Sequence, residues 1–245
     1  MDRRSLWLLL LALCVLLPAC ENKAVIHAPA TIRVLTDEAV RSGSIGGPVD
    51  PHAPRLRSNA ALLDPVIRVS TRLIAAARRS EFGSQALALC WSIAVYEDPA
   101  PSRTFVTPDG AIVVSTGSFD LAQTEAGLAA LLSHELMHAL LRGAASLSPP
   151  CSGHTTAPPP ALFTYEEEMR ADELGLKLMA DAGYDPGELL HLWKRMKRQN
   201  DGVADALLVH VTYDRRMDRM MQWWSDALTR YERVNRAPQK ALPSK

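Results

Sequence analysis

The spacing of apolar residues along this chain predicts a protein built mainly from helices. In five stretches apolar side chains recur every three or four residues, which is typical of a helix with one buried face. Alternation in residues 89–96 predicts a strand, and a β-branched run at 111–116 predicts a second one. The expected helices cover residues 64–79, 124–141, 165–182, 185–198 and 204–233, the last being interrupted near 210–214.

Local signals mark several ends of these elements. Asp64 before Pro65 is typical of a helix start, and Gly183 is typical of a helix end. By contrast, residues 21–57 show no sustained period and hold several glycines and prolines, so they predict an irregular arm. One stripe of the last helix is expected in the core: Met217, Met220, Met221, Trp224 and Leu228.

Composition indicates one folded domain with tails. The chain has 245 residues, of which 47% are hydrophobic, enough for a single core. Lysine plus arginine and aspartate plus glutamate number 27 each, so charge gives no reason to expect a nucleic-acid partner. We expect a lipoprotein signal peptide at 1–19, a tether or irregular arm at 20–57, the folded domain at 58–236 and a disordered tail at 237–245.

The N-terminus predicts export and a lipid anchor. The apolar run at 6–17 measures about 18 Å as a helix, too short for a bilayer core of about 30 Å, and is typical of a secretory signal. It ends in Leu17-Pro18-Ala19-Cys20, which resembles the lipobox of bacterial lipoproteins. This resemblance implies a lipidated Cys20 that holds the protein on the periplasmic side of the bacterial outer membrane. An ordinary cleaved signal with a free Cys20 is the alternative.

Two further cysteines, Cys90 and Cys151, remain after such processing. In an oxidising compartment they can form a disulfide, and two unpaired buried thiols are the alternative. The sequence leaves both alternatives open.

The pattern with the most chemistry is His134-Glu135-Leu136-Met137-His138, inside the helix expected at 124–141. Histidines four residues apart lie on one face of a helix, where two imidazoles can bind one Zn²⁺. Glu135 lies about 100° around the helix and can act as general base on a water at the metal. The motif arises by chance in about one chain in a hundred of this size. An amphipathic helix with two unrelated histidines is therefore the alternative, although the apolar surroundings of Glu135 favour the metal site.

A third metal ligand is expected from the helix at 165–182. Glu168 and Asp172 lie four residues apart, on the face that also carries Gly175 and Met179 and that must pack inward. The two glutamates that precede Glu168 point away from this face, by the 3.6-residue period. An acidic helix start favoured by the helix dipole is the alternative, but it explains Asp172 less well.

These motifs together resemble the HtpX-like family of zinc metallopeptidases, which includes the prenyl-protein proteases and outer-membrane lipoprotein members. The resemblance runs from about residue 86 to 218, and six segments carry it: residues 91–93, residues 108–117, the His134–His138 motif, residues 168–172, residues 182–186, and His210 with Arg216. Val211 and residues 102–105 depart from the family pattern. The resemblance implies an α+β, mostly helical fold, a gluzincin-type metallopeptidase domain with a small β-sheet beside the active-site helix.

The resemblance also implies roles for single residues. One set would bind and support one zinc ion per chain: His134, His138 and Glu168 as ligands, with Asp172 and Arg216 as their partners. A second set would act on the substrate: Glu135 as general base and His210 as donor to the oxyanion, a packed or exposed His210 being the alternative.

The expected function is a periplasm-facing, membrane-anchored zinc endopeptidase that cleaves unfolded or misassembled envelope proteins. An extended substrate could pair by strand addition with the second expected strand, through Ile112, Val113, Val114 and Ser115. His154 stands in a proline-flanked loop, where it could form a lid over the metal, but ordering it as a ligand would cost entropy. A non-proteolytic outer-membrane assembly factor or chaperone that keeps zinc for shape is the alternative, although such a site needs no Glu135.

Overall fold

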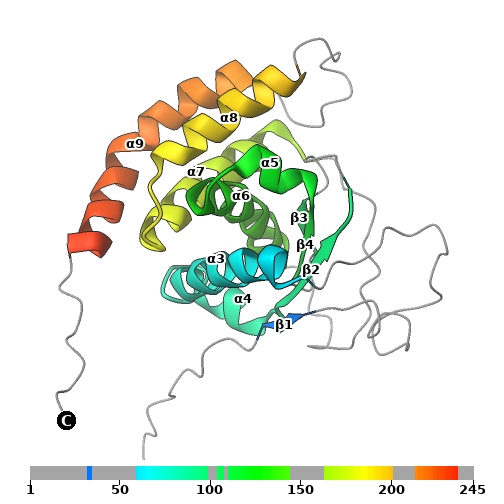
Figure 1. Cartoon of the computed structure of the whole chain (residues 1–245). Coiled ribbons are helices and arrows are strands. Elements are labelled where there is room, and N and C mark those ends of the chain that lie inside the picture. The colour runs from blue at the N-terminus through cyan, green and yellow to red at the C-terminus, as the bar shows by residue number, and fades with distance from the viewer. Residues whose placement is uncertain are drawn as a thin grey trace, which may run out of the picture.

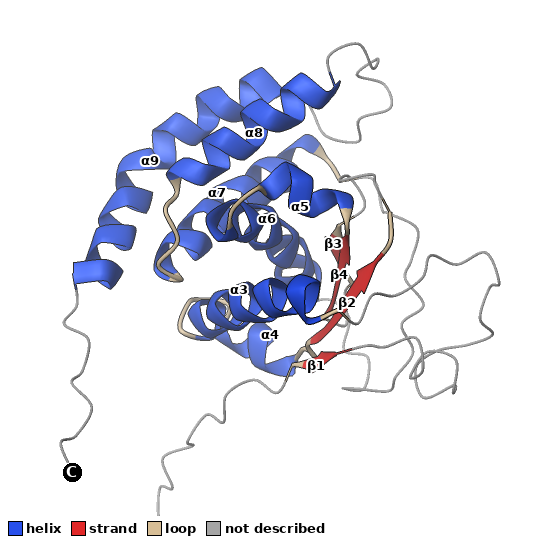
Figure 2. Cartoon of the chain, viewed as in Figure 1, coloured by secondary structure: helices blue, strands red, loops and turns tan. Residues whose placement is uncertain are grey.

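The structure is a computed structural model that describes residues 32–34, 59–98, 104–107, 110–143, 163–200 and 213–236. As predicted, this part of the chain is mostly helical and holds a small mixed β-sheet (Figure 2). Its elements, in chain order, are β1 (Arg33–Val34), α3 (Ala60–Arg78), α4 (Gly83–Ala88), β2 (Ser92–Tyr96), β3 (Phe105–Val106), β4 (Ala111–Ser115), α5 (Gly117–Ala122), α6 (Glu125–Gly143), α7 (Tyr165–Asp181), α8 (Gly187–Asn200) and α9 (Tyr213–Arg236).

Helix α6 lies at the centre, and the other elements surround it. The sheet and α3 cover one side, α5, α7 and α8 cover the others, and α9 packs on the outer side of α7 (Figure 1). This position explains why α6 is apolar around most of its circumference, since a helix with no solvated face needs few polar residues.

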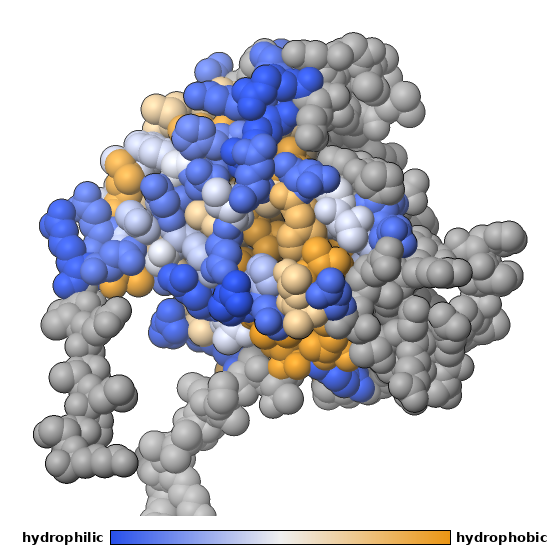
Figure 3. All heavy atoms as spheres, viewed as in Figure 1, coloured by the Kyte–Doolittle hydropathy of each residue, from blue (hydrophilic) through white to orange (hydrophobic). Residues whose placement is uncertain are grey.

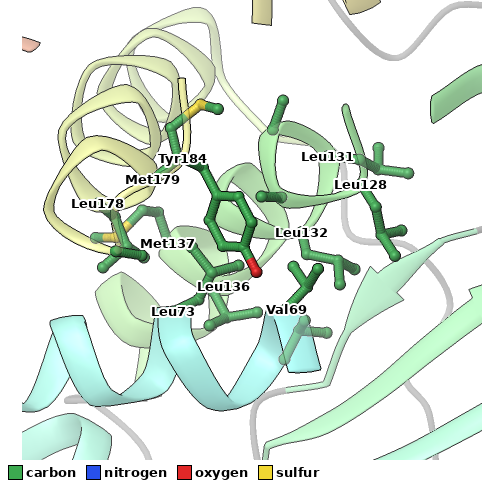
Figure 4. Close-up of a cluster of buried hydrophobic side chains, with 14 of the residues drawn as sticks. Val69, Leu73, Leu128, Leu131, Leu132, Leu136, Met137, Leu178, Met179 and Tyr184 are labelled. Atoms are coloured by element: carbon green, nitrogen blue, oxygen red, sulfur yellow. The ribbon is translucent and has the colours of Figure 1, made fainter. Parts of the chain in front are cut away.

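The core forms where α3, α6 and α7 meet. Leu132 and Leu136 of α6 are fully buried, and in Figure 4 they lie between Val69 of α3 and Met179 of α7. Burying one such side chain contributes about 1.5–3 kcal/mol to the free energy of unfolding. Because the same helix carries the two histidines of the motif one turn apart, the core holds those histidines in a rigid frame.

A glycine lets α6 and α7 approach closely. A Cβ added at Gly175 would lie 3.1 Å from the backbone nitrogen of His134 and 3.2 Å from its Cα. As predicted, Gly175 shares the buried face of α7 with Glu168 and Asp172. The close approach brings both carboxylates of α7 up to the histidine face of α6.

The sheet has the strand order β1-β2-β4-β3, in which only β3 is antiparallel to its neighbour. Strand β1 pairs Arg33 with Ser92 and Val34 with Ile93 of β2. The prediction of a wholly irregular arm at 20–57 is therefore wrong at this point. A two-residue strand is too short to produce a period in the sequence, and its pairing partner lies far along the chain.

Strand β4 is an inner strand, paired with β2 on one side and with β3 on the other. Directly before β3, Oγ1 of Thr104 accepts a hydrogen bond from the backbone N–H of Ser115, at the end of β4, at 3.2 Å. An inner strand has no free edge for a substrate, so the strand addition predicted for Ile112, Val113, Val114 and Ser115 is wrong. Among the described strands, the outer edge on this side of the sheet belongs to β3, which also packs against α6.

Helix boundaries follow the capping residues. Helix α3 begins before the predicted start at Asp64, because the side chain of Asn59 accepts a hydrogen bond from the N–H of Ala61 at 2.9 Å. Pro65 therefore lies inside the helix, where it removes one backbone hydrogen bond. Gly183 follows Ala182, the C-cap of α7, and has a φ of +77°, as expected of a residue that ends a helix. The six-residue helices α4 and α5 were not predicted, since they are too short to show a period.

Helix α9 packs through one face only. Met220 and Ala227 are buried on that face, whereas Met221 is 58% exposed, so the prediction that Met221 lies in the core is wrong. In Figure 3 hydrophilic side chains cover the C-terminal end of this helix. No helix in the described ranges combines the length and the apolar character needed to cross a bilayer.

Several predictions fall on residues outside the described part. They include the signal peptide, lipidation of Cys20, and the roles of His154 and His210, and all of them stay predictions, as do the expected domain boundaries. Cys90 is disulfide-bonded. Because Cys151 is not described, its pairing with Cys90 also stays a prediction.

We expect Gly175→Ala to lower the free energy of unfolding by about 1 kcal/mol. Overpacking against the backbone of His134 costs about 1–3 kcal/mol, and better helix propensity offsets about 1 kcal/mol of it. Urea unfolding measures the change. Gly187→Ala is the control, because a Cβ there would meet only the flexible side chain of Asp185. A Gly175→Ala protein as stable as the Gly187→Ala protein would contradict the close approach.

Candidate metal centre

Three buried side chains converge between α6 and α7: His134, His138 and Glu168. The Nε2 atoms of the two histidines lie 3.0 Å apart. The Glu168 carboxylate oxygens lie 3.4 Å from Nε2 of His134 and 3.5 Å from Nε2 of His138. Ligands at about 2.0–2.1 Å in a tetrahedral zinc site are about 3.3 Å from one another, so the three donors fit a zinc ion.

The start of α7 places Glu168. The side chain of Thr164 accepts from the N–H of Glu167 at 3.2 Å, and the Glu167 carboxylate accepts from the N–H of Thr164 at 2.8 Å. This capping box fixes the first turn of α7. The helical phase then turns Glu168 inward and leaves Glu166 exposed, as the sequence predicted.

A chain of charged groups supports His134 from behind. Nδ1 of His134 lies 2.9 Å from Oδ1 of Asp172. The guanidinium of Arg216, from α9, donates to both oxygens of Asp172 at 2.6 and 2.5 Å, and lies 3.4 Å from Glu168. A carboxylate on the second nitrogen of a ligand histidine fixes the tautomer and the ring orientation. Arg216 in turn fixes Asp172.

Trp193 of α8 completes the surroundings of Arg216. The guanidinium carbon lies 3.8 Å from the centre of the indole ring, and the same indole meets His134 edge-on at 6.2 Å between ring centres. Arg216 is fully buried, so the ring and the carboxylates replace its hydration shell. The sequence analysis did not identify Trp193 as part of the site, because the apolar face of α8 accounts for a tryptophan without it.

Phe163 is a second neighbour that the sequence analysis missed. Its ring stacks on His138 at 3.7 Å between centres, and the guanidinium of Arg142 lies 3.9 Å from its centre. The one signal in the sequence was its position directly before the N-cap of α7. An apolar residue there often packs on the fourth residue of the helix.

The buried charges shift one another's pKa values in the metal-free protein. Burial alone would lower the pKa of His134, but its hydrogen bonds with Asp172 and Glu168 outweigh burial and raise the pKa to about 10. Burial would raise the pKa of Asp172, but Arg216 and His134 hold it below its usual value. Burial lowers the pKa of His138. His134 therefore carries a proton at neutral pH that a metal ion has to displace.

Glu135 stands apart from the ligand set. Its side chain is half-buried and lines a pocket beside the histidines. The walls of this pocket are mostly apolar and include Leu189, Leu192, Trp193 and Met196 of α8, with His134 and Arg216 at the polar side. A carboxylate that lines such a pocket next to the metal donors can reach both a water and a bound peptide.

Comparison with known proteins agrees with this geometry. Residues 66–147 match the model of peptidase family M48. The matched segment contains His134, Glu135 and His138, and it includes most of α3 and α6. At the family level the expected resemblance is therefore confirmed, whereas nothing in the match supports the outer-membrane lipoprotein type.

Three curated relatives share the name mitochondrial metalloendopeptidase OMA1. The protein of Schizosaccharomyces pombe is 29% identical over 191 residues, which cover 68% of this chain and 54% of the relative. Those of Saccharomyces cerevisiae and Arabidopsis thaliana are 28% and 27% identical, over 58% and 55% of this chain and 49% and 32% of the relatives. The chain thus spans about half the length of the two yeast relatives and about a third of the length of the plant relative. These likenesses agree with the predicted class, a zinc metalloendopeptidase.

The same relatives overturn the predicted location. They are mitochondrial proteins by name, so the predicted location, the periplasmic side of the bacterial outer membrane, is wrong. That prediction rested on residues 1–21 alone. An apolar leader shows only that a segment has affinity for an apolar environment. Targeting to more than one kind of membrane requires such a segment, so the pattern is weak evidence for a particular compartment.

We expect Glu168→Ala to lose most of the bound zinc. Loss of a residue that only supports a ligand weakens metal binding by about 10–100-fold. Removal of one of the three protein ligands should weaken zinc binding by more than that. Zinc content after dialysis against a weak chelator measures the change. Glu166→Ala is the matched control, since Glu166 is exposed one half-turn away on the same helix. Full zinc content in Glu168→Ala would contradict the ligand set.

Zinc affinity should rise about tenfold per pH unit between about pH 7 and 9, because binding displaces the proton of His134. The proton on His134 also affects the stability of the metal-free protein. The folded-state pKa of about 10 lies above the model value of 6.5, so protonation of His134 stabilises the fold fully below pH 6.5. This stabilisation is lost as the pH rises through about 10.

Competition with a chromophoric chelator at several pH values measures the zinc affinity. Asp172→Asn is the comparison variant. It removes the carboxylate that raises the pKa of His134, and should therefore give a shallower pH dependence. A wild-type affinity that stays constant from pH 7 to 9 would contradict the buried proton.

Proposed function

We propose that this protein is a zinc-dependent endopeptidase that hydrolyses peptide bonds with a water activated beside Glu135. One observation carries the proposal: a half-buried carboxylate that is not needed as a ligand lies next to three donors arranged for zinc. A zinc site that only stabilises a fold closes its fourth position with another protein ligand. This makes a non-proteolytic, zinc-retaining assembly factor the weaker alternative.

The residues of the chain divide the work. Zinc, when bound, supplies a Lewis acid that polarises a carbonyl oxygen and lowers the pKa of a water to about 7. Glu135 takes the proton of that water and delivers it to the leaving amine. His134, His138 and Glu168 would hold the metal. Asp172 and Arg216 keep His134 oriented, because their hydrogen bonds fix the ring that the metal needs.

The substrate we propose is a polypeptide in extended conformation, bound along the outer edge of β3. The N–H of Thr107 donates to Ala111 at 2.9 Å, so Thr107 is bonded to β4. In an antiparallel pair bonded residues alternate, and Val106 therefore directs its backbone N–H and C=O away from β4. A peptide paired there would lie beside α6, and this edge replaces the one predicted on β4.

The pocket beside Glu135 suggests which side chain lies next to the cleaved bond. Leu192 and Trp193 of α8 line it, so an apolar side chain fits better than a charged one. The envelope substrates expected from the N-terminus were inferred from the bacterial location, so they are not proposed here. Unfolded protein segments with apolar residues remain the proposed substrate class.

The test is cleavage of casein by zinc-loaded protein. Glu135→Gln should keep its zinc and lose at least about 10²-fold in rate, the scale of general acid–base catalysis. Glu166→Gln is the matched control, an exposed glutamate that should leave the rate unchanged. If Glu135→Gln cleaves as fast as the wild type, the mechanism is wrong. If the zinc-loaded wild type cleaves no unfolded protein, the proposed function is wrong.

A further inference from the structure

The two ligand histidines of the proposed site are supported in different ways. His134 has the Asp172 carboxylate 2.9 Å from its Nδ1. His138 has an aromatic ring against its face instead. The rings of His138 and Phe163 lie 3.7 Å apart between centres, with 23° between their planes. The histidine is thus covered by a nearly parallel ring from the segment that leads into α7.

Arg142 lies on the opposite side of the Phe163 ring. Its guanidinium carbon is 3.9 Å from the ring centre, and His138 is at 3.7 Å. Two groups that close to one ring centre would overlap if they shared a face, so they lie on opposite faces. The result is a column of three planar groups, His138, Phe163 and Arg142, in which the first and last come from successive turns of α6.

The same column is tied to the start of α7. Nη2 of Arg142 donates to Oε1 of Glu167 at 3.2 Å, and Glu167 forms the capping box with Thr164. Phe163 directly precedes this cap, at the position from which an apolar side chain normally packs on the fourth helical residue. That residue is Glu168, a carboxylate directed at the metal donors, and the phenyl ring packs on His138 instead.

We propose that Phe163 and Arg142 are positioning residues that set the orientation of His138 for metal binding. This inference rests on the proposed zinc site. Rotation of an imidazole about its χ2 torsion has a broad energy minimum, so Nε2 of an unrestrained histidine moves over a wide arc. A ring stacked on its face removes that freedom, and Arg142 holds the ring from behind. We call Phe163 and Arg142 together the clamp. At one end it contacts the ligand His138, and at the other it contacts Glu167, which adjoins the ligand Glu168.

The stack also suits a metal-bound imidazole. Coordination withdraws electron density from the imidazole, and an electron-poor ring is attracted to the negative face of a phenyl ring. The guanidinium of Arg142 uses the other face in the same manner. The clamp therefore stabilises His138 in the orientation that binds metal, and it does so without a further buried carboxylate beside Glu168 and Asp172.

The test is the zinc dissociation constant, measured by competition with a chromophoric chelator on the full chain. Phe163→Leu should raise this constant by about tenfold, the lower end of what loss of an outer-shell partner causes. Phe163→Tyr keeps an aromatic face and should stay within about twofold of the wild type. Arg142→Gln should raise the constant by less than Phe163→Leu does, because it leaves the ring in place.

Phe119→Leu is the matched control, since Phe119 is likewise half-buried but packs on the hydrophobic core. Thermal melting of the metal-free proteins separates packing from positioning. If Phe163 serves only for packing, Phe163→Leu lowers the melting temperature as Phe119→Leu does and binds zinc as the wild type does. That outcome overturns the inference, as does a Phe163→Tyr protein that binds zinc as weakly as Phe163→Leu. Casein cleavage by the wild type reports on the proposed function separately, because zinc affinity is measured without it.

Discussion

The close packing of α6 on α7 is the constraint on which the site depends. Gly175 has no side chain to hold the helices apart, and its neighbours on the same face are Glu168 and Asp172. At this distance the two carboxylates enter the space in front of the histidine face of α6, where both are buried. Two carboxylates in an apolar interior are unstable unless positive charge accompanies them.

The other groups of the centre supply that positive charge. Arg216 arrives from α9 and bonds to Asp172, which accounts for one of the two negative charges. In the metal-free protein the proton on His134 accounts for the other, and this is why the pKa of His134 is raised. A divalent cation can take over from the proton. The same arrangement therefore keeps the apo protein folded and prepares it for metal.

Aromatic rings pack around this charged centre. Trp193 lies against Arg216, and Phe163 lies between His138 and Arg142. Both rings exclude water from one side of a polar group without adding another charge, which a site with two buried carboxylates could not accommodate easily. Glu135 is the group left facing the pocket, and its position next to the donors separates a catalytic from a merely structural arrangement.

The sequence by itself determined the parts of the site that depend on the period of a helix. The common face of His134 and His138, the inward direction of Glu168, and the glycine at 175 all follow from 3.6 residues per turn, which needs no knowledge of other segments. The existence of five long helices and a small sheet was likewise predicted, with errors at the ends where a cap such as Asn59 competed with Asp64.

Only the tertiary structure decided which distant segments meet. The pairing of Arg33–Val34 with β2, the inner position of β4, the exposure of Met221 and the stack of Phe163 on His138 leave no periodic trace in the sequence. Each joins residues from separate elements, so it depends on how whole helices and strands pack. Local sequence sets the face that a side chain occupies, but long-range packing sets what that face touches.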